Sequence, residues 1–310
     1  MLAWVTGGAG FLGSHIADAL LRRGWDVVAV DDLSTGEAAQ VDRRVRLHRT
    51  RVQEAEELLA NDRPEIVFHF AGDARIARSV VDPRVDCERN LGATLELLES
   101  IRKRSPQTRV LFASTGAVYG GSAARAFRED DPVFPLSPYA VSKLAAERYC
   151  YAYAETFGLR TCSLRLFSVY GPRQRKQVVY DLIRKLHDRP AELAILGDGT
   201  QERDFSHVDN IVDAFLLAAE RAAFAGEAIN AAGNEVIRIS QLAEMLCQVM
   251  NVAPRIVYGG QLRAGDSQRW VADTERLRAM GYSPRVTLLE GLRNTVDWYR
   301  SHPEAALFEG

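Results

Sequence analysis

Two side chains with complementary acid–base chemistry stand four residues apart near the middle of the chain. Tyr139 and Lys143, in the segment Tyr-Ala-Val-Ser-Lys, fall on the same face if the segment is helical. A phenol has a pKa of about 10, so it is a poor base at neutral pH unless a nearby positive charge favours the phenolate. Lys143 would provide that charge. On its own this spacing is common in helices, and a solvated lysine beside a half-buried tyrosine would explain it equally well.

A glycine-rich turn near the N-terminus indicates phosphate binding. Residues 6–13 read Thr-Gly-Gly-Ala-Gly-Phe-Leu-Gly and join an apolar run to a helix-like segment. Gly7, Gly10 and Gly13 would let the backbone turn tightly and approach a pyrophosphate, and the helix N-terminus would offer free N–H groups. Asp31 ends the next apolar run, near the spacing at which an acid binds the ribose of a dinucleotide. A carboxylate there repels a 2′-phosphate, so the pattern predicts NAD rather than NADP.

Hydroxyl side chains follow another apolar run, residues 110–113. Ser114 and Thr115 come directly after it. Because ligands bind at the carboxyl ends of the strands in open α/β sheets, these hydroxyls are expected at the same edge as the glycine turn. The sequence therefore predicts one site that combines Thr115 with Tyr139 and Lys143.

The order of the elements explains how such a site would be assembled. Strand-like runs lie at residues 2–6, 27–30, 66–70, 110–113 and 161–166, and helix-like segments at 14–23, 54–60, 93–103 and 139–157. Alternation of this kind predicts βαβ units whose right-handed crossovers bring every strand's carboxyl end to one edge. The expected fold class is α/β, a Rossmann-type doubly wound parallel sheet with a smaller C-terminal lobe.

The pattern changes after about residue 172. Helix-like segments at 211–220, 240–250 and 288–300 no longer alternate strictly with strands. We expect residues 1–172 to form an NAD-binding domain and residues 173–310 a substrate-binding lobe. Residues 204–219 could return to the first domain.

Composition excludes several classes of protein. The chain has 310 residues, 47% of them hydrophobic, with 39 Lys and Arg against 41 Asp and Glu. These values suit a globular protein with a core, and they exclude a disordered chain and a disulfide-stapled miniprotein. Near-neutral charge argues against a nucleic-acid or membrane-surface partner, and no apolar run is long enough to cross a bilayer. The four cysteines have no metal-ligand spacing, so no metal, reduced thiols and a cytoplasmic location are expected.

Taken in order along the chain, the motifs resemble those of the extended short-chain dehydrogenases/reductases, in particular the UDP-glucose 4-epimerase group of nucleotide-sugar enzymes. The resemblance spans residues 2–300 and rests on residues 6–13, 31–36, 69–72, 115–120, 139–143, 166–174, 197–205 and 263–266. It implies that Thr115 hydrogen-bonds the sugar hydroxyl to be oxidised and that Tyr139 removes its proton. It also implies that Lys143 binds the nicotinamide ribose and, with the positive nicotinamide, lowers the pKa of Tyr139. The implied cofactor-binding residues are Gly7, Gly10, Phe11, Leu12, Gly13, Asp31, Asp32, Phe70, Ala71, Gly72, Asn90, Ser114, Tyr139 and Lys143.

The resemblance also implies a nucleotide-sugar site in the C-terminal lobe. Arg203 and Arg263 would bind the diphosphate, and Asp266 the nucleoside ribose. A guanidinium can pair bidentately with phosphate oxygens. Without the resemblance, surface salt bridges would be the better explanation of the two arginines.

The residues after Thr115 bear on the reaction. Dehydratases and decarboxylases of the resembled family carry an acid beside the catalytic hydroxyl, whereas Gly116 and Ala117 stand here. This favours 4-epimerisation of a UDP-sugar, by transient oxidation at C4 and return of the hydride to the other face. A 4,6-dehydratase, a decarboxylase, a C2-epimerase and a non-catalytic sensor of NAD or nucleotide sugar remain as alternatives. The resemblance also implies a homodimer, with Ala140, Leu144 and Ala145 near the interface unless they pack on the sheet.

Three positions depart from the pattern of the group. Ser168 replaces the usual asparagine, and Arg51 stands where an acid usually holds the adenine. The bulky Trp270 occupies a position that limits pocket size, which predicts exclusion of N-acetylated sugars. Ser168 and Arg175 together resemble UDP-glucuronate 4-epimerases, in which the arginine faces the sugar carboxylate. Arg175 could equally be a solvated member of the basic segment 173–176. The substrate pair is therefore UDP-glucose and UDP-galactose or UDP-glucuronate and UDP-galacturonate.

Overall fold

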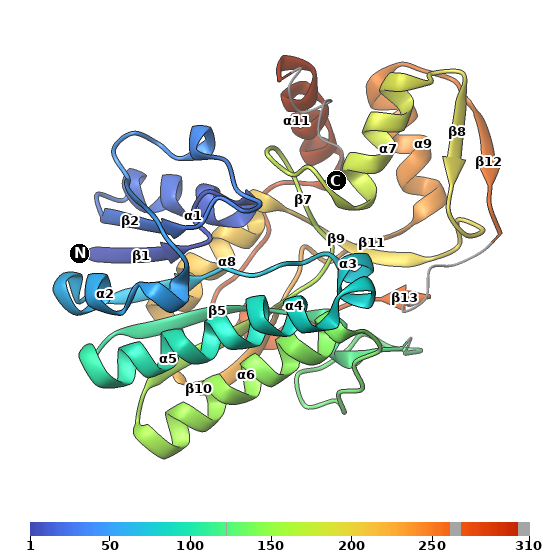
Figure 1. Ribbon diagram of the computed structural model, residues 1–310. Coiled ribbons are helices and arrows are strands. Elements are labelled where there is room, and N and C mark those ends of the chain that lie inside the picture. The colour runs from blue at the N-terminus through green and yellow to red at the C-terminus, as the bar shows by residue number, and fades with distance from the viewer. Residues whose placement is uncertain (122, 261–267, 303–310) are drawn as a thin grey trace.

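The computed structural model describes residues 1–121, 123–260 and 268–302 and is built on a seven-stranded sheet (Figure 1). The strands lie in the order β10-β6-β5-β4-β1-β2-β3, and every neighbouring pair is parallel. Their bounds are β1 (Leu2–Thr6), β2 (Asp26–Asp31), β3 (Arg46–Arg49), β4 (Ile66–His69), β5 (Arg109–Thr115), β6 (Arg160–Leu166) and β10 (Ala225–Ala231). All seven carboxyl ends share one edge, so the predicted fold class is confirmed.

Strand β1 shows how the sheet separates two layers of helices. Ala3 and Val5 pack in one apolar cluster with α1 (Phe11–Arg22) and α8 (Val208–Arg221), whereas Trp4 packs on the opposite face. The second face is covered by α2 (Glu56–Asp62), α5 (Ala93–Arg104) and α6 (Pro138–Phe157). Helices α5 and α6 run side by side in the lower part of Figure 1. Burial of both faces explains why the central strands are almost continuously apolar.

The connection from β4 to β5 is a nearly unbroken helical segment. It consists of α3 (Ile76–Val81), α4 (Pro83–Cys87), the π-helical turn η3 (Glu88–Gly92) and α5. Turns of this kind are rare and recur at functional sites. The turn carries Asn90, one of the residues predicted to line the cofactor site.

The remaining elements build a smaller lobe, at the upper right of Figure 1. Its main sheet is centred on β9 (Glu202–His207), which pairs with β7 (Val169–Tyr170), β11 (Glu235–Arg238) and β13 (Arg269–Trp270). A second, two-stranded sheet joins β8 (Glu192–Ile195) to β12 (Arg255–Tyr258). An apolar cluster holds these strands to α7 (Gln177–Asp188), α9 (Ile239–Met250) and α11 (Leu288–Ser301). Outside this lobe, the loops after β2, β3 and β5 of the large sheet hold the short helical pieces η1 (Ala38–Gln40), η2 (Val52–Glu54) and η4 (Gly116–Tyr119), and α10 (Glu275–Ala279) follows β13.

The chain passes between the two lobes more than once. After β9, helix α8 packs beside α1, and β10 then pairs with β6 in a register that joins Ile229 to Leu164. Residues 208–231 therefore lie in the first lobe, although they follow much of the second in sequence. None of the described helices combines the length and apolar character of a membrane-spanning segment.

Candidate active site

The three catalytic candidates meet where β5 and α6 approach each other. Strand β5 ends at Thr115, and α6 begins at Pro138, after the N-cap residue Ser137, whose hydroxyl accepts the N–H of Ala140 at 3.2 Å. Tyr139 stands in the first turn of α6, is 8% exposed, and hydrogen-bonds the Thr115 side chain. The strand's end and the helix's start thus bring together two residues that are distant in sequence.

Lys143 lies one turn further along α6 and is buried. Its Nζ is 4.1 Å from the centroid of the Phe112 ring, and burial lowers the pKa of its ammonium to about 8. Burial raises the pKa of Tyr139 to about 12, and the carboxylates of Asp86 and Asp73 add to the rise, against the hydrogen bond with Thr115. Among the protein's own groups it is the hydrogen bond with Thr115 that lowers this pKa, and burial outweighs it. The predicted lowering by Lys143 is therefore not seen, and the positive nicotinamide is the other charge on which that prediction relied.

Several buried polar residues around this trio were missed in the sequence. His69 is hydrogen-bonded through Nδ1 to Thr6 Oγ1 at 2.6 Å and through Nε2 to Thr94 Oγ1 at 3.1 Å. Burial, with Lys143 nearby, lowers the pKa of His69 to about 3, so it stays neutral. Ser142 Oγ donates to Asp86 Oδ2 at 2.6 Å. The signal available for Ser142 was its place in the motif between Tyr139 and Lys143.

The glycine turn has the shape that a dinucleotide phosphate requires. Gly7 has φ +67°, and a Cβ there would lie 2.8 Å from the backbone nitrogen of Ala71. A Cβ on Gly13 would lie 2.1 Å from the carbonyl oxygen of Gly7. Helix α1 begins after Gly10 with no side-chain cap, so the first amides of the helix, at Phe11 and Leu12, face outward at its positive end. The turn therefore fits NAD.

The acid predicted to hold the adenosine ribose lies beside this turn. Asp31 is buried at the end of β2, where its Oδ2 accepts the N–H of Ala9 at 2.9 Å and its Oδ1 that of Leu33 at 2.8 Å. Burial raises the pKa of Asp31, and the two amides oppose the rise. For Asp32, burial is outweighed by hydrogen bonding with Ser34 and by the positive charges of Arg89 and Arg51, so its pKa is lowered. Arg51 thus stands close to the predicted ribose site.

The residues after β4 form the other side of the predicted cofactor site. Phe70 packs on Phe215, with ring centroids 4.7 Å apart, and Ala71 passes next to Gly7. Asn90 Oδ1 accepts the N–H of Asp73 at 2.9 Å, and its Nδ2 donates to the Asp73 carbonyl at 3.1 Å. A Cβ on Gly72 would lie 2.4 Å from Asn90 Oδ1. In this structure Asn90 therefore fixes the loop that follows β4.

Of the predicted substrate residues, Arg203 lies in the smaller lobe, on β9. Trp270 packs against the buried cluster that includes Tyr139 and Ala117, and its ring lies 6.2 Å from that of Phe167. Arg203 stands beside it in the sheet, with its guanidinium 5.9 Å from the indole, and Ser168 is half-buried between β6 and β7. Arg263 and Asp266 lie outside the described residues. In the described ranges no group of three His, Cys, Asp or Glu side chains is placed to hold a metal.

Arg175 is placed between the two lobes. It is only 12% exposed and forms an ion pair with Glu37, in the loop that follows β2. The N–H of Glu37 in turn donates to the carbonyl of Ala9 at 2.9 Å, within the glycine turn. The alternative of a solvated surface arginine is therefore wrong, because the side chain is buried against an acid.

Comparison with known proteins agrees with this arrangement. The chain matches the model of the "NAD dependent epimerase/dehydratase family" over residues 3–232. It is 34% identical to a UDP-glucose 4-epimerase of Mycolicibacterium smegmatis, with 97% of this chain and 99% of that protein aligned. A structure of Thermus thermophilus UDP-glucose 4-epimerase in complex with NAD is 35% identical, with a TM-score of 0.88 and coverage of 97% and 99%.

A second solved structure carries a different substrate name. The UDP-glucuronic acid 4-epimerase from Bacillus cereus, in complex with UDP-glucuronic acid and NAD, is 30% identical to this chain, with a TM-score of 0.89 and coverage of 97% and 99%. Both the family match over most of the chain and the glycine turn with its acid point to the same cofactor. The chain therefore belongs to the NAD dependent epimerase/dehydratase family and is an enzyme that uses NAD.

Proposed function

We propose that this protein is a nucleotide-sugar 4-epimerase that interconverts UDP-glucose and UDP-galactose. The observation that carries the proposal is the burial of Thr115, Tyr139 and Lys143 where β5 and α6 approach each other, at the sheet edge that also carries the glycine turn. The names of the relatives at about one-third identity support the UDP-sugar.

The roles of the three residues follow from their chemistry. NAD would supply the acceptor, and then the donor, of the hydride at C4. Thr115 would hold the C4 hydroxyl, and Tyr139 would take its proton and later return it. Lys143 would bind the nicotinamide ribose, and its charge together with that of the oxidised nicotinamide would counteract the effect of burial on Tyr139. Proton transfer of this kind is typically worth about 10²–10⁴-fold in rate.

The absence of a proton donor beside Thr115 supports epimerisation over loss of water. A Cβ on Gly116 would lie 2.7 Å from the Phe167 ring, and the rest of η4 is Ala117, Val118 and Tyr119, without an acid. The nearby carboxylates are engaged elsewhere. Asp73 pairs with Arg75 at 2.7 Å, and Asp86 accepts from Ser142 at 2.6 Å.

The partner of Arg175 bears on the choice of sugar. The positive charge of Arg175 is already matched by the carboxylate of Glu37, which supports a neutral hexose over a uronic acid as the substrate. UDP-glucuronate is the second candidate, because Arg175 already binds one carboxylate and would need only to exchange it for that of the sugar. Ser168 would then donate a second hydrogen bond to the sugar carboxylate.

The test is incubation of the purified protein with UDP-, dTDP-, GDP- and CDP-sugars, read by NMR. Inversion at C4 of UDP-glucose is expected. Loss of water or carbon dioxide, or inversion at C2, would contradict the proposal. Binding without turnover would favour a sensor of nucleotide sugars.

We also propose a homodimer formed through α6, with a revised set of residues. Ala140 and Leu144, two of the residues implied by resemblance, pack into the chain's own clusters. Exposed large apolar side chains are instead Val141, Tyr149, Tyr151 and Phe157 of α6 and Val80 and Val81 of α3, from which we take Val141 as the test position. Light scattering should give a dimer, and Val141→Glu should shift it towards the monomer. A wild-type monomer at micromolar concentration would contradict this.

A further inference from the structure

A buried ion pair joins the catalytic helix to two strands of the large sheet. Glu147 lies one turn beyond Lys143 on α6 and pairs with Arg165 of β6; their side chains are 3% and 2% exposed. Arg165 donates from Nη2 to Glu147 Oε1 at 2.6 Å and from Nε to Oε2 at 3.0 Å. Ser114, next to Thr115, donates its hydroxyl to the same Oε2 at 2.6 Å. One carboxylate therefore holds β5, β6 and α6 together beside the catalytic trio.

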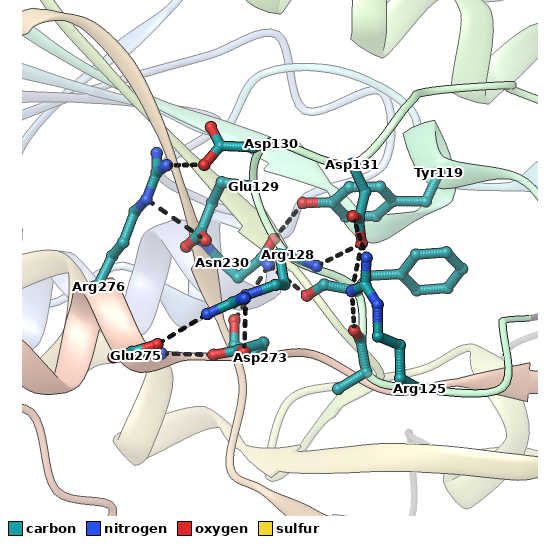
Figure 2. Close-up of polar contacts among 12 residues, drawn as sticks. Tyr119, Arg125, Arg128, Glu129, Asp130, Asp131, Asn230, Asp273, Glu275 and Arg276 are labelled. Atoms are coloured by element: carbon teal, nitrogen blue, oxygen red, sulfur yellow. Dashed lines mark hydrogen bonds and ion pairs between the residues drawn. The ribbon is translucent and has the colours of Figure 1, made fainter.

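The network continues from Arg165 toward the smaller lobe. Arg165 Nη1 donates to the Tyr119 hydroxyl at 2.7 Å, and that hydroxyl donates to Asn230 Oδ1 at 2.7 Å. Asn230 Nδ2 in turn donates to the carbonyls of Phe127 at 2.9 Å and Asp273 at 3.1 Å. Figure 2 shows Asn230 between Tyr119 and the segment of Asp273.

The far end of the network fixes the segment that carries Trp270. The N–H of Phe127 donates to the Val271 carbonyl at 2.8 Å, and the N–H of Asp273 donates to the Phe127 carbonyl at 2.8 Å. Phe127 stacks on Tyr119 with centroids 4.7 Å apart and belongs to the cluster against which Trp270 packs.

Surface ion pairs surround this end of the network. In Figure 2, Arg276 reaches Glu129 and Asp130, and Arg128 reaches Asp273 and Glu275. They link the loop after η4 to the start of α10, on the outer side of the Asn230 contacts. The hydrogen-bond network that begins at Glu147 therefore ends at residues 271–273, which the backbone of Phe127 contacts on one side and the ion pairs stabilise on the other.

We propose that Glu147 is a positioning residue for the reaction. With Arg165 and Ser114 it sets the separation between Thr115 on β5 and Tyr139 and Lys143 on α6. Through Tyr119 and Asn230 it aligns these three residues with the part of the smaller lobe around Arg203 and Trp270, which we call the wall. The inference rests on the proposed epimerase function. Displacement of a reacting group by about 1 Å can cost about 10²-fold in rate. Replacing a buried ion pair with apolar side chains often leaves stability unchanged or higher, so stability alone does not require this pair.

The experiment separates positioning from stability. Glu147→Gln leaves the Arg165 charge unpaired and should lower both the melting temperature and kcat. The double variant Glu147→Met with Arg165→Met removes both charges, so we expect a melting temperature near that of wild type. Its kcat should still be about tenfold lower or more, and KM for UDP-galactose should rise as it does in the Tyr119→Phe variant below, because Arg165 no longer reaches Tyr119. Ser114→Ala should lower kcat by a smaller factor, because only one link to β5 is lost.

Two further variants test where along the network the effect arises. Tyr119→Phe cuts the link to Asn230 but leaves the Glu147–Arg165 pair, so it should raise KM more than it lowers kcat. Glu99→Gln is the matched control. Glu99 of α5 also binds an arginine, accepting two hydrogen bonds of 2.9 Å from Arg102. It also accepts the hydroxyl of Tyr153 at 2.7 Å, but this contact lies at the far end of α6 from Tyr139. Its kcat should match wild type.

The outcomes distinguish this inference from the function on which it rests. An active wild type together with a folded double variant of unchanged kcat would overturn the positioning role and leave the epimerase proposal standing. If the double variant does not fold, unchanged kcat in Ser114→Ala and an unchanged KM in Tyr119→Phe would overturn it. A wild type without turnover of any nucleotide sugar would overturn both proposals.

Discussion

The buried polar side chains beside the proposed catalytic residues and those on the wall of the smaller lobe, around Arg203 and Trp270, differ in whether they have hydrogen-bond partners. At the catalytic edge, His69, Asp86 and Glu147 all have partners inside the protein. On the wall, the side-chain amide of Gln201 and the indole N–H of Trp270 are buried without a hydrogen-bond partner among the described residues. Buried polar groups are normally paired. The contrast indicates that the catalytic half is organised by its own contacts, whereas the described part of the wall leaves these groups of Gln201 and Trp270 to other partners.

The strongest test of the organised half is removal of the proposed base. Tyr139→Phe should lower kcat by about 10²–10⁴-fold, because the Tyr139 hydroxyl is the group that hydrogen-bonds Thr115. The aromatic ring remains, so the melting temperature should change little. NMR of C4 inversion gives the rate, and Tyr149→Phe, an exposed tyrosine on the same helix, is the control. A loss of less than tenfold would assign the proton transfer to another group.

A buried acid behind the wall gives a test by pH. Burial raises the pKa of Asp204 from 3.8 to about 7, and its Oδ1 has no hydrogen-bond partner among the described residues. The folded state therefore binds this proton more tightly than the unfolded state, so stability falls as pH rises from about 4 to 7 and the full loss persists above 7.

Asp204→Asn removes this charge but keeps an oxygen for the amide of Ala272. In urea unfolding at pH 8 the variant should be more stable than wild type by on the order of 2–4 kcal/mol, and the gain should shrink towards pH 4. Hydrogen bonding with Thr200 lowers the pKa of the exposed Asp198, so Asp198→Asn should show a pH dependence of the opposite sign. A gain for Asp204→Asn that does not vary with pH would contradict the assignment.

The ion pair between Arg175 and Glu37 gives a test of substrate specificity. Glu37→Gln frees the Arg175 guanidinium from its carboxylate, so the ratio of kcat/KM for UDP-glucuronate over UDP-glucose should rise by about tenfold or more. Adding Arg175→Ala should cancel the gain. Asp18→Asn, which breaks the neighbouring pair with Arg173, is the matched control and should leave the ratio unchanged. A wild type that already prefers UDP-glucuronate would instead support the second candidate substrate.

The smallest expected effect concerns the bulk of Trp270. An indole beside Tyr139 leaves less room for an acetamido group, and overpacking costs about 1–3 kcal/mol. Trp270→Cys should therefore raise kcat/KM for UDP-N-acetylglucosamine by about fivefold or more. UDP-glucose serves as the control substrate and should change little. Comparable turnover of both sugars by wild type would refute a gating role.

Periodic segments were predictable from the sequence, and pairings across the fold were not. Strand β1 has the predicted bounds, and α6 differs from the predicted helix 139–157 only by including Pro138. The segment Ala-Gly-Glu-Ala-Ile-Asn-Ala of β10 lacks a long apolar run, so its place in the large sheet gave no local signal.

The same limit applies to the candidate site. The glycine turn, Asp31, Thr115, Tyr139 and Lys143 stand in motifs with fixed local spacing. The pairing of Glu147 with Arg165 joins a helix to a strand, and only the spacing of Glu147 from Lys143 hinted at a third buried polar group on that face of α6. The raised pKa of Tyr139 depends on burial, which no local spacing reports.

The late position of β10 in the chain has a consequence for folding during synthesis. As the chain leaves the ribosome, β6 emerges with one edge unpaired, and its partner β10 follows only after α7, β9 and α8 have been made. An open edge strand invites pairing with other chains. Domains usually fold as units, N-terminal first, but here the larger lobe cannot complete its sheet until much of the smaller lobe has been translated. The nascent chain therefore carries an aggregation-prone edge through that interval, and the two lobes finish folding together.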